Sequence, residues 1–97
     1  MEESLDTPAT QATGHNNTIV GVYMDRVEIQ TGWQGQNIES VGLRDVASVR
    51  VRGLVNVTLG IQTNKGRVFE VKRMALPDAR RVKSAIEKAK ERAGLYE

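Results

Sequence analysis

The chain has 97 residues, with 14 Lys and Arg residues against 12 Asp and Glu residues, a net charge of +2 and no cysteine. This length accommodates one small core and excludes two independent ones. The lack of cysteine argues against a disulfide-stabilised secreted domain, and no apolar stretch reaches the roughly 20 residues of a membrane-spanning helix. The acidic start, MEESLD, lacks the apolar segment of a secretory signal, so we expect a cytoplasmic protein.

The charges are distributed unevenly along the chain. Residues 1–43 contain one basic and six acidic residues, whereas residues 44–97 contain thirteen basic and six acidic residues. Such a division can mark an anionic partner, either a nucleic acid or a lipid surface. A solvated charged face on a helix near the C-terminus explains it equally simply, and we favour this explanation.

The first 17 residues differ in composition from the rest of the chain. Their only large apolar residues are Met1 and Leu5, and they are rich in Thr, Ala, Asn, Glu and Gln. A segment of this kind buries too little apolar surface to offset the entropy lost on ordering. We therefore predict a disordered N-terminal tail over residues 1–17 and a folded domain over residues 18–97.

A strand hairpin is predicted at the start of this domain. Residues 18–24, TIVGVYM, are dense in β-branched and aromatic residues, which favour strands. Asp25 suits a tight turn, and residues 26–31, RVEIQT, then place Val27 and Ile29 on one face. The pattern indicates two antiparallel strands with a very short connection.

A weaker third strand and a fourth strand follow a polar loop. The loop, TGWQGQN over residues 31–37, contains the only tryptophan between two glycines. A third strand is predicted over residues 38–43, and a fourth over residues 48–53, SVRVRG. In the fourth, valine alternates with arginine, so the valines should face inward and the arginines outward.

The clearest strand pattern lies over residues 54–63, LVNVTLGIQT. Its period of two predicts one inward face, formed by Val55, Val57, Leu59 and Ile61. The following Asn-Lys-Gly suits a hairpin turn in which Gly66 adopts a positive φ. A sixth strand over residues 67–73 should then direct Phe69 and Val71 to one face.

From Pro77 onward the apolar period becomes that of a helix. Proline suits the first turn, Asp78 complements the positive end of the helix dipole, and Gly94 suits the C-terminal cap. A narrow apolar stripe recurs at spacings of three and four residues: Ala79, Val82, Ile86, Ala89 and Ala93. We expect this helix to lie close against the sheet.

This order of strands and one final helix resembles the pleckstrin-homology (PH)-like fold, in particular the short bacterial PH-domain proteins. The resemblance covers about residues 18–93 and depends on VGLRDVASVRV, LGIQTNKGRVFEV and DARRVKSAIEKA. It implies a mainly β (α+β) fold, an antiparallel β-sandwich or open barrel of about six to seven strands closed by one C-terminal helix. A small Sm-like or SH3-like barrel is our second choice.

What the resemblance implies about function is an adaptor for phosphoinositides, peptides or proteins, or an oligomeric assembly module. Phosphoinositide-binding members carry Lys and Arg in and beside the loop between their first two strands. This chain has Met24-Asp25-Arg26 there, which is too short and too nearly neutral to hold a headgroup. The phosphoinositide function is therefore not transferred to this chain.

The sequence contains no recognisable catalytic or metal-binding pattern. His15 is the only histidine and has no Cys, Asp or Glu at metal-ligand spacing. The serines have no histidine base in the predicted domain, and the carboxylates single out no catalytic pair. The glycines of GWQG match neither a P-loop nor a dinucleotide-binding pattern. We expect neither enzymatic activity nor a cofactor.

The candidate binding residues are one tryptophan and a group of basic residues. Trp33 is equally suited to anchor an interface and to cover the edge of a small core. If the last three strands form a meander, one cationic surface could contain Arg50, Arg52, Lys65, Arg67, Lys72 and Arg73. Nucleic acid could bind there through its phosphates, but four aromatic residues provide few stacking platforms.

We therefore expect a non-catalytic binding or adaptor module for a protein partner or for a second copy of the chain. Strand edges left unpaired in a small open barrel would provide the contact surface. The alternative is peripheral binding to anionic membrane lipid through the basic face, with Trp33 as the anchor. Sequence-independent binding of nucleic acid is the least favoured possibility.

Overall fold

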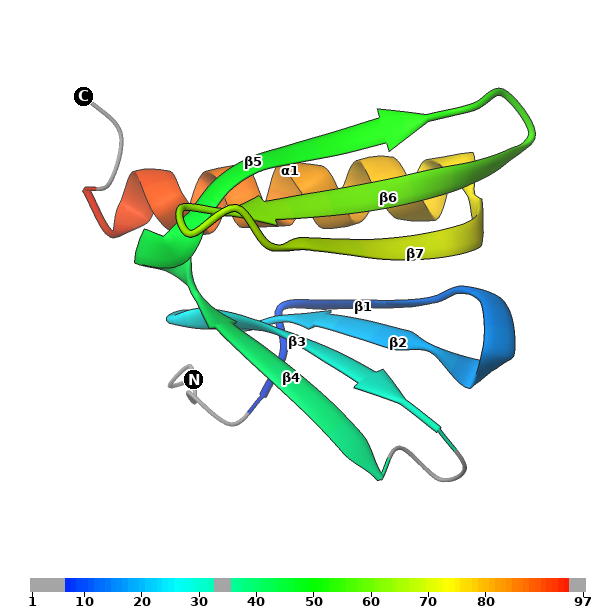
Figure 1. The fold of residues 1–97 in the computed structure, drawn as a ribbon. Helices are drawn as coiled ribbons and strands as arrows, with labels where there is room; N and C mark the ends of the chain where they lie inside the picture. The colour runs from blue at the N-terminus through cyan, green and yellow to red at the C-terminus, as the bar shows by residue number, and fades with distance from the viewer. Residues whose placement is uncertain (1–6, 33–35, 95–97) are drawn as a thin grey trace.

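The computed structural model describes residues 7–32 and 36–94, which form two antiparallel sheets and one C-terminal helix (Figure 1). The first sheet has the order β1-β2-β3-β4, with β1 at Thr10–Thr13, β2 at Ile19–Val22, β3 at Arg26–Thr31 and β4 at Asn37–Gly42. The second has the order β5-β6-β7, with β5 at Val46–Arg52, β6 at Asn56–Thr63 and β7 at Val68–Ala75. Helix α1 follows directly at Leu76–Arg92.

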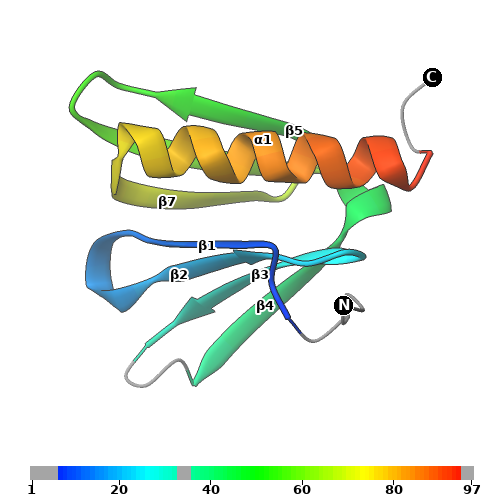
Figure 2. The same cartoon turned by 180° about the vertical axis from the view of Figure 1, so that it is seen from behind.

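The predicted fold class is confirmed. Each sheet is an up-and-down antiparallel meander, and the chain passes from one sheet to the other at the corner between β4 and β5 (Figure 1). Helix α1 contacts strands of both sheets, and Figure 2 shows it in front of the second sheet and beside β1. This mainly β arrangement with one closing helix is compatible with a PH-like fold.

The prediction of disorder was wrong for part of the N-terminal segment. Strand β1 lies within residues 1–17 and pairs with β2, with Ala12 opposite Val20. The Ala9 N–H donates to the Val22 carbonyl at 2.8 Å, and Ala12 is buried. Small polar residues give this strand little apolar periodicity, so its order comes from hydrogen bonds to β2 that the local sequence does not reveal. Residues 1–6 of the predicted tail lie outside the described residues.

The predicted hairpin after this segment is confirmed. Val22 pairs with Val27, and the Tyr23 N–H donates to the Arg26 carbonyl at 2.8 Å, which closes the short connection. Val27 and Ile29 are both buried, as their alternation predicted.

Strand β6 confirms most of the predicted inward face. Val57, Leu59 and Ile61 are fully buried, but Val55 is 81% exposed, so the prediction for Val55 was wrong. The pairing of β6 with β7 ends at Asn56 and Ala75, and Val55 lies beyond this pair, in the turn. Side chains alternate between the two faces only within a strand, so residues beyond its end do not follow the pattern.

The predicted features of the following hairpin are confirmed. Gly66 adopts a φ of 89° in the turn between β6 and β7. Val71 is fully buried, and Phe69 is half-buried and packs against the core. Farther along β7, Arg73 has a φ of 57°, where the register between β6 and β7 shifts at a bulge.

Helix α1 buries the first part of the predicted stripe. Ala79, Val82 and Ile86 are fully buried, Ala89 is half-buried, and Ala93 is exposed beyond the last turn. The core that they enter lies between the two sheets and the helix, and includes buried residues of all seven strands. Gly94 follows with a φ of 71°, which confirms its predicted place at the C-terminal cap.

Lys90 departs from the amphipathic pattern of the helix. It is only 9% exposed, and its ammonium donates a hydrogen bond to the Val46 carbonyl at 2.6 Å. The side chain thereby joins the last turns of α1 to the first residue of β5.

The Lys90→Met variant is expected to lower the free energy of unfolding by about 1–3 kcal/mol, because methionine keeps the apolar stem and removes the charged donor. Urea denaturation followed by circular dichroism measures this. The control is Lys88→Met, which changes an exposed residue of the same helix and should alter stability by less than about 0.5 kcal/mol. Equal effects of the two changes would contradict a structural role for the Lys90 hydrogen bond.

Candidate binding groove

The structure brings together only part of the predicted cationic surface. On the outer face of the second sheet, Gly60 pairs with Arg50 on one side and with Glu70 on the other. The Arg52 guanidinium lies 3.2 Å from the Glu70 carboxylate, and both side chains are largely exposed. A carboxylate therefore lies among the arginines, which weakens the positive potential of this face.

Two further predicted residues lie near one end of the same sheet. Arg52 pairs with Thr58, and Thr58 lies opposite the bulge that contains Lys72 and Arg73. Arg52, Lys72 and Arg73 are all exposed. We call these three cations the basic belt.

The last two predicted basic residues lie elsewhere, near the turn between β6 and β7. Lys65 is exposed in that turn. The Arg67 guanidinium lies 4.6 Å from the centre of the Phe69 ring and 3.7 Å from the Glu39 carboxylate on β4. The six predicted basic residues thus do not form one surface. Trp33, the other candidate, lies outside the described residues.

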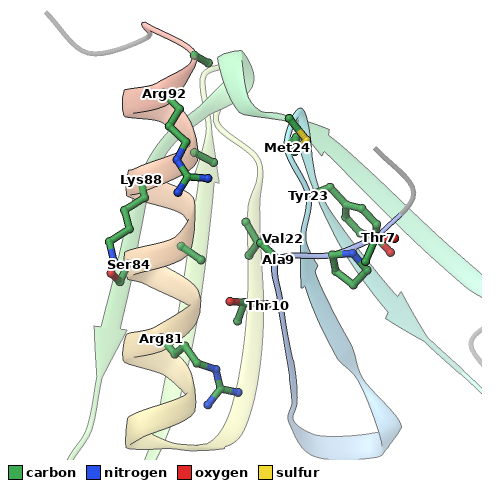
Figure 3. A pocket seen from close by; sticks show the side chains of 14 residues that line it. Thr7, Ala9, Thr10, Val22, Tyr23, Met24, Arg81, Ser84, Lys88 and Arg92 are labelled. Carbon is green, nitrogen blue, oxygen red and sulfur yellow. The ribbon is translucent and has the colours of Figure 1, made fainter. Parts of the chain in front are cut away.

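The structure contains a concave site that the sequence did not indicate. A groove of about 710 Å³ runs between α1 and the N-terminal part of the first sheet (Figure 3). One wall comes from residues 7–10, Val22, Tyr23 and Met24. The opposite wall is formed by α1, through Arg81, Ser84, Ala85, Lys88, Ala89, Arg92 and Ala93.

Small residues on the helix create this groove. Ala85, Ala89 and Ala93 recur at intervals of four residues, so they lie along one flank of the helix. Their methyl groups leave space between the helix and strand β2, where a larger side chain would fill it. These alanines and the buried Val22 of the opposite wall form the apolar floor of the groove.

Tyr23, which lines the groove, is held in place by its contact with Arg26. The Arg26 guanidinium lies over the Tyr23 ring, 4.2 Å from its centre. Arg26 also donates hydrogen bonds of 2.7 Å to Glu28 and to Asp25. These hydrogen bonds, that to Glu28 foremost, raise the pKa of Arg26 above its usual value, since they favour the charged form. Next to this ring, Met24 is 46% exposed and provides an adaptable apolar surface.

The rim of the groove is positively charged. Arg81, Lys88 and Arg92 come from the helix, and Figure 3 shows Arg81 and Arg92 extending toward the opposite wall. Arg81 binds Asp78 at 3.0 Å and donates a hydrogen bond to the Gln11 carbonyl at 3.1 Å, so it also connects α1 with β1. Among the residues that the structure describes, none of those lining the groove carries a carboxylate. An anionic ligand would therefore find an apolar floor and a cationic rim together.

The described residues offer no candidate metal site. Within residues 7–32 and 36–94, no three His, Asp or Glu side chains are grouped so as to hold a metal ion. His15 lies at the edge of β7, where its Nδ1 accepts a hydrogen bond from the Lys72 backbone N–H at 3.0 Å. This contact fastens the N-terminal segment to the second sheet. In the same part of the chain, no helix combines the length and apolarity needed to cross a membrane.

The groove as a whole could not be recognised from the sequence, because its two walls come from segments that are far apart in the chain. The alanines at 85, 89 and 93 and the neighbouring basic residues were a usable signal, since their spacing places them on one side of a helix. The opposite wall includes residues 7–10, which the sequence assigned to a disordered tail. Comparison of the sequence with protein-family models and with curated proteins finds no match.

Proposed function

We propose that this chain is a non-catalytic, PH-like binding module that docks an acidic protein segment with apolar side chains. The observation that supports this is the groove beside α1, where an apolar floor is bordered by Arg81, Lys88 and Arg92, and where the described lining residues include no carboxylate. Apolar side chains would occupy the floor, and carboxylates of the same segment would approach the rim. Concave apolar sites with a few polar groups are the usual form of a binding site.

The dimensions of the groove suit a short peptide segment. From Arg81 to Ala93 the helix rises by roughly 18 Å, at about 1.5 Å per residue. An extended segment of about five or six residues has this length, at about 3.3 Å per residue. The volume of about 710 Å³ can receive two or three apolar side chains of such a segment, but not a folded domain.

The cations should determine which segments bind more than how tightly they bind. Lys88 and Arg92 are exposed, so their attraction for carboxylates is screened by water and salt. They would accelerate association with acidic segments and exclude basic ones. The apolar floor, together with the neighbouring Tyr23 and Met24, would supply most of the affinity.

A second copy of this chain is one possible source of the acidic segment. The hexapeptide MEESLD at residues 1–6 combines three carboxylates with a leucine. Light scattering after size exclusion tests this source: a molar mass that rises with concentration, and falls when a synthetic MEESLD peptide is added, supports self-docking. A constant monomer mass would exclude this source and leave a different protein as the proposed partner.

The direct test selects peptides from a random display library on the immobilised full chain. The enriched peptides should combine Asp or Glu with large apolar residues. Binding of the best peptide, measured by fluorescence anisotropy, should weaken about tenfold or more in the Lys88→Glu, Arg92→Glu double variant, which corresponds to about 1.4 kcal/mol. Amide chemical shifts of α1 and β2 should move when the peptide is added to the labelled wild-type protein.

The matched control is the Arg44→Glu, Lys65→Glu double variant. It changes the net charge by the same amount at two exposed residues outside the groove lining, and should weaken binding by no more than about twofold. Equal losses in the two variants would show that only overall charge matters. That result, or a selection without acidic peptides, would overturn the proposed docking groove.

A further inference from the structure

The turn between β5 and β6 exposes two adjacent aliphatic side chains. Leu54 is 88% exposed and Val55 is 81% exposed, the highest values among the large apolar residues of the described chain. The turn itself requires neither of them, because Gly53 supplies the positive φ of 114° that reverses the chain. Turns normally carry Gly, Asn, Asp, Pro or Ser. The fold itself therefore does not explain why two large apolar side chains are exposed at this turn.

These residues lie at a projecting end of the molecule. The last paired residues of the hairpin between β6 and β7 are Asn56 and Ala75, and Leu54 and Val55 lie beyond them. Both views show the turn extending past the first turn of α1 (Figures 1 and 2). A projecting apolar tip can enter the boundary between headgroups and acyl chains of a membrane, provided that cations beside it meet the headgroups.

The basic belt lies directly behind this tip. Arg52 precedes Leu54 by two residues, and its partner Thr58 connects it across the sheet to Lys72 and Arg73. All three cations are exposed, and the Glu70 carboxylate on this face lies 3.2 Å from the Arg52 guanidinium. Residues 53–58 and 71–77 contain no Asp or Glu. This end of the sheet is therefore apolar at the tip and positively charged behind it.

We propose that this end of the molecule contacts the surface of an anionic phospholipid membrane. Leu54 and Val55 enter the boundary between headgroups and acyl chains, and the basic belt binds the negatively charged headgroups. We expect the contact to be reversible and not to depend on one kind of headgroup, because the three cations of the belt are exposed to solvent. This surface is separate from the groove beside α1, and neither proposal depends on the other.

Co-sedimentation with lipid vesicles tests the proposal on the full chain. Vesicles of phosphatidylcholine with roughly 30% phosphatidylserine should bind the protein, and vesicles of phosphatidylcholine alone should not. Raising the salt concentration from about 50 mM to about 300 mM should weaken binding several-fold, because it screens the basic belt. The Leu54→Ser, Val55→Ser double variant should weaken binding about tenfold.

The matched control replaces two other exposed aliphatic residues. Ile38 and Val68 are each 56% exposed and lie away from the tip, so Ile38→Ser with Val68→Ser should change vesicle binding by no more than about twofold. Circular dichroism shows that each variant is folded before it is tested. Lack of binding to anionic vesicles, equal binding to neutral vesicles, or equal losses in the two double variants would each overturn the proposal.

Discussion

The Gly14→Ala variant is expected to lower the free energy of unfolding by about 2–3 kcal/mol and to loosen the N-terminal strand. A Cβ at position 14 would collide with Cγ1 of Val71 and would lie 2.9 Å from the Lys72 carbonyl oxygen and 3.3 Å from Cγ of Met74. Val71 and Met74 are fully buried, and the carbonyl belongs to the backbone of β7. None of these groups can move away without disturbing the core.

Two measurements check this expectation. Urea denaturation gives the stability, and hydrogen exchange of the β1 and β2 amides shows whether the N-terminal strand opens first. The control is Gly60→Ala, because a Cβ there would have its nearest neighbour, the Arg50 carbonyl oxygen, at 4.0 Å. This change should alter stability by less than about 1 kcal/mol. Equal effects of the two changes would show that the contact of Gly14 with β7 does not support the fold.

Loss of this contact should also affect binding. Residues 7–10 form part of one wall of the groove and precede Gly14 by only a few residues. A variant that remains folded but loosens β1 would therefore bind an acidic peptide more weakly, without any change to a charged residue.

The Ile86→Ala variant is expected to cost about 2–5 kcal/mol of stability, a large fraction of the roughly 5–10 kcal/mol available to a small domain. Ile86 is fully buried in the core between α1 and the sheets, and alanine would leave a cavity there. The Ile86→Val variant removes one methylene and should cost about 0.5–1.5 kcal/mol. Thermal and urea denaturation measure this graded loss.

The control for this series is Glu87→Ala, which changes the next residue of the same helix. Glu87 is exposed, so its removal should alter stability by less than about 0.5 kcal/mol. An Ile86→Ala cost no greater than that of Glu87→Ala would contradict the placement of Ile86 in the core. Because α1 forms one wall of the groove, a displaced helix should also weaken peptide binding.

The elements that the sequence predicted well are those with a strong local period. Strand β6 alternates Val57, Leu59 and Ile61 with polar residues or glycine, and all three are buried. The helix repeats its apolar residues at intervals of three and four, and its first buried residues agree with that stripe. In both, the residues themselves carry the pattern of the surface against which they pack.

The predictions that were wrong concern residues whose environment comes from distant parts of the chain. Strand β1 has few apolar residues and is ordered by its pairing with β2 and by the packing of Gly14 on β7. Lys90, which the helical pattern does not distinguish from the exposed basic residues of α1, is buried because its ammonium donates a hydrogen bond to the Val46 carbonyl, 44 residues earlier. Val55 is exposed because pairing with β7 ends one residue later in the chain, at Asn56.

The class of the fold, the hairpin turns and the apolar face of the closing helix can be predicted from the chain itself, because each depends on the spacing of neighbouring residues. The surfaces available for contact arise only when distant segments pack together. The groove exists because an alanine flank of α1 lies beside an N-terminal segment about 75 residues away in the chain. The basic residues separate because strand register places Arg52, Lys72 and Arg73 together and directs Arg67 toward Glu39. Local periodicity determines which residues are inside, whereas the docking of distant segments determines the shape and charge of the surface.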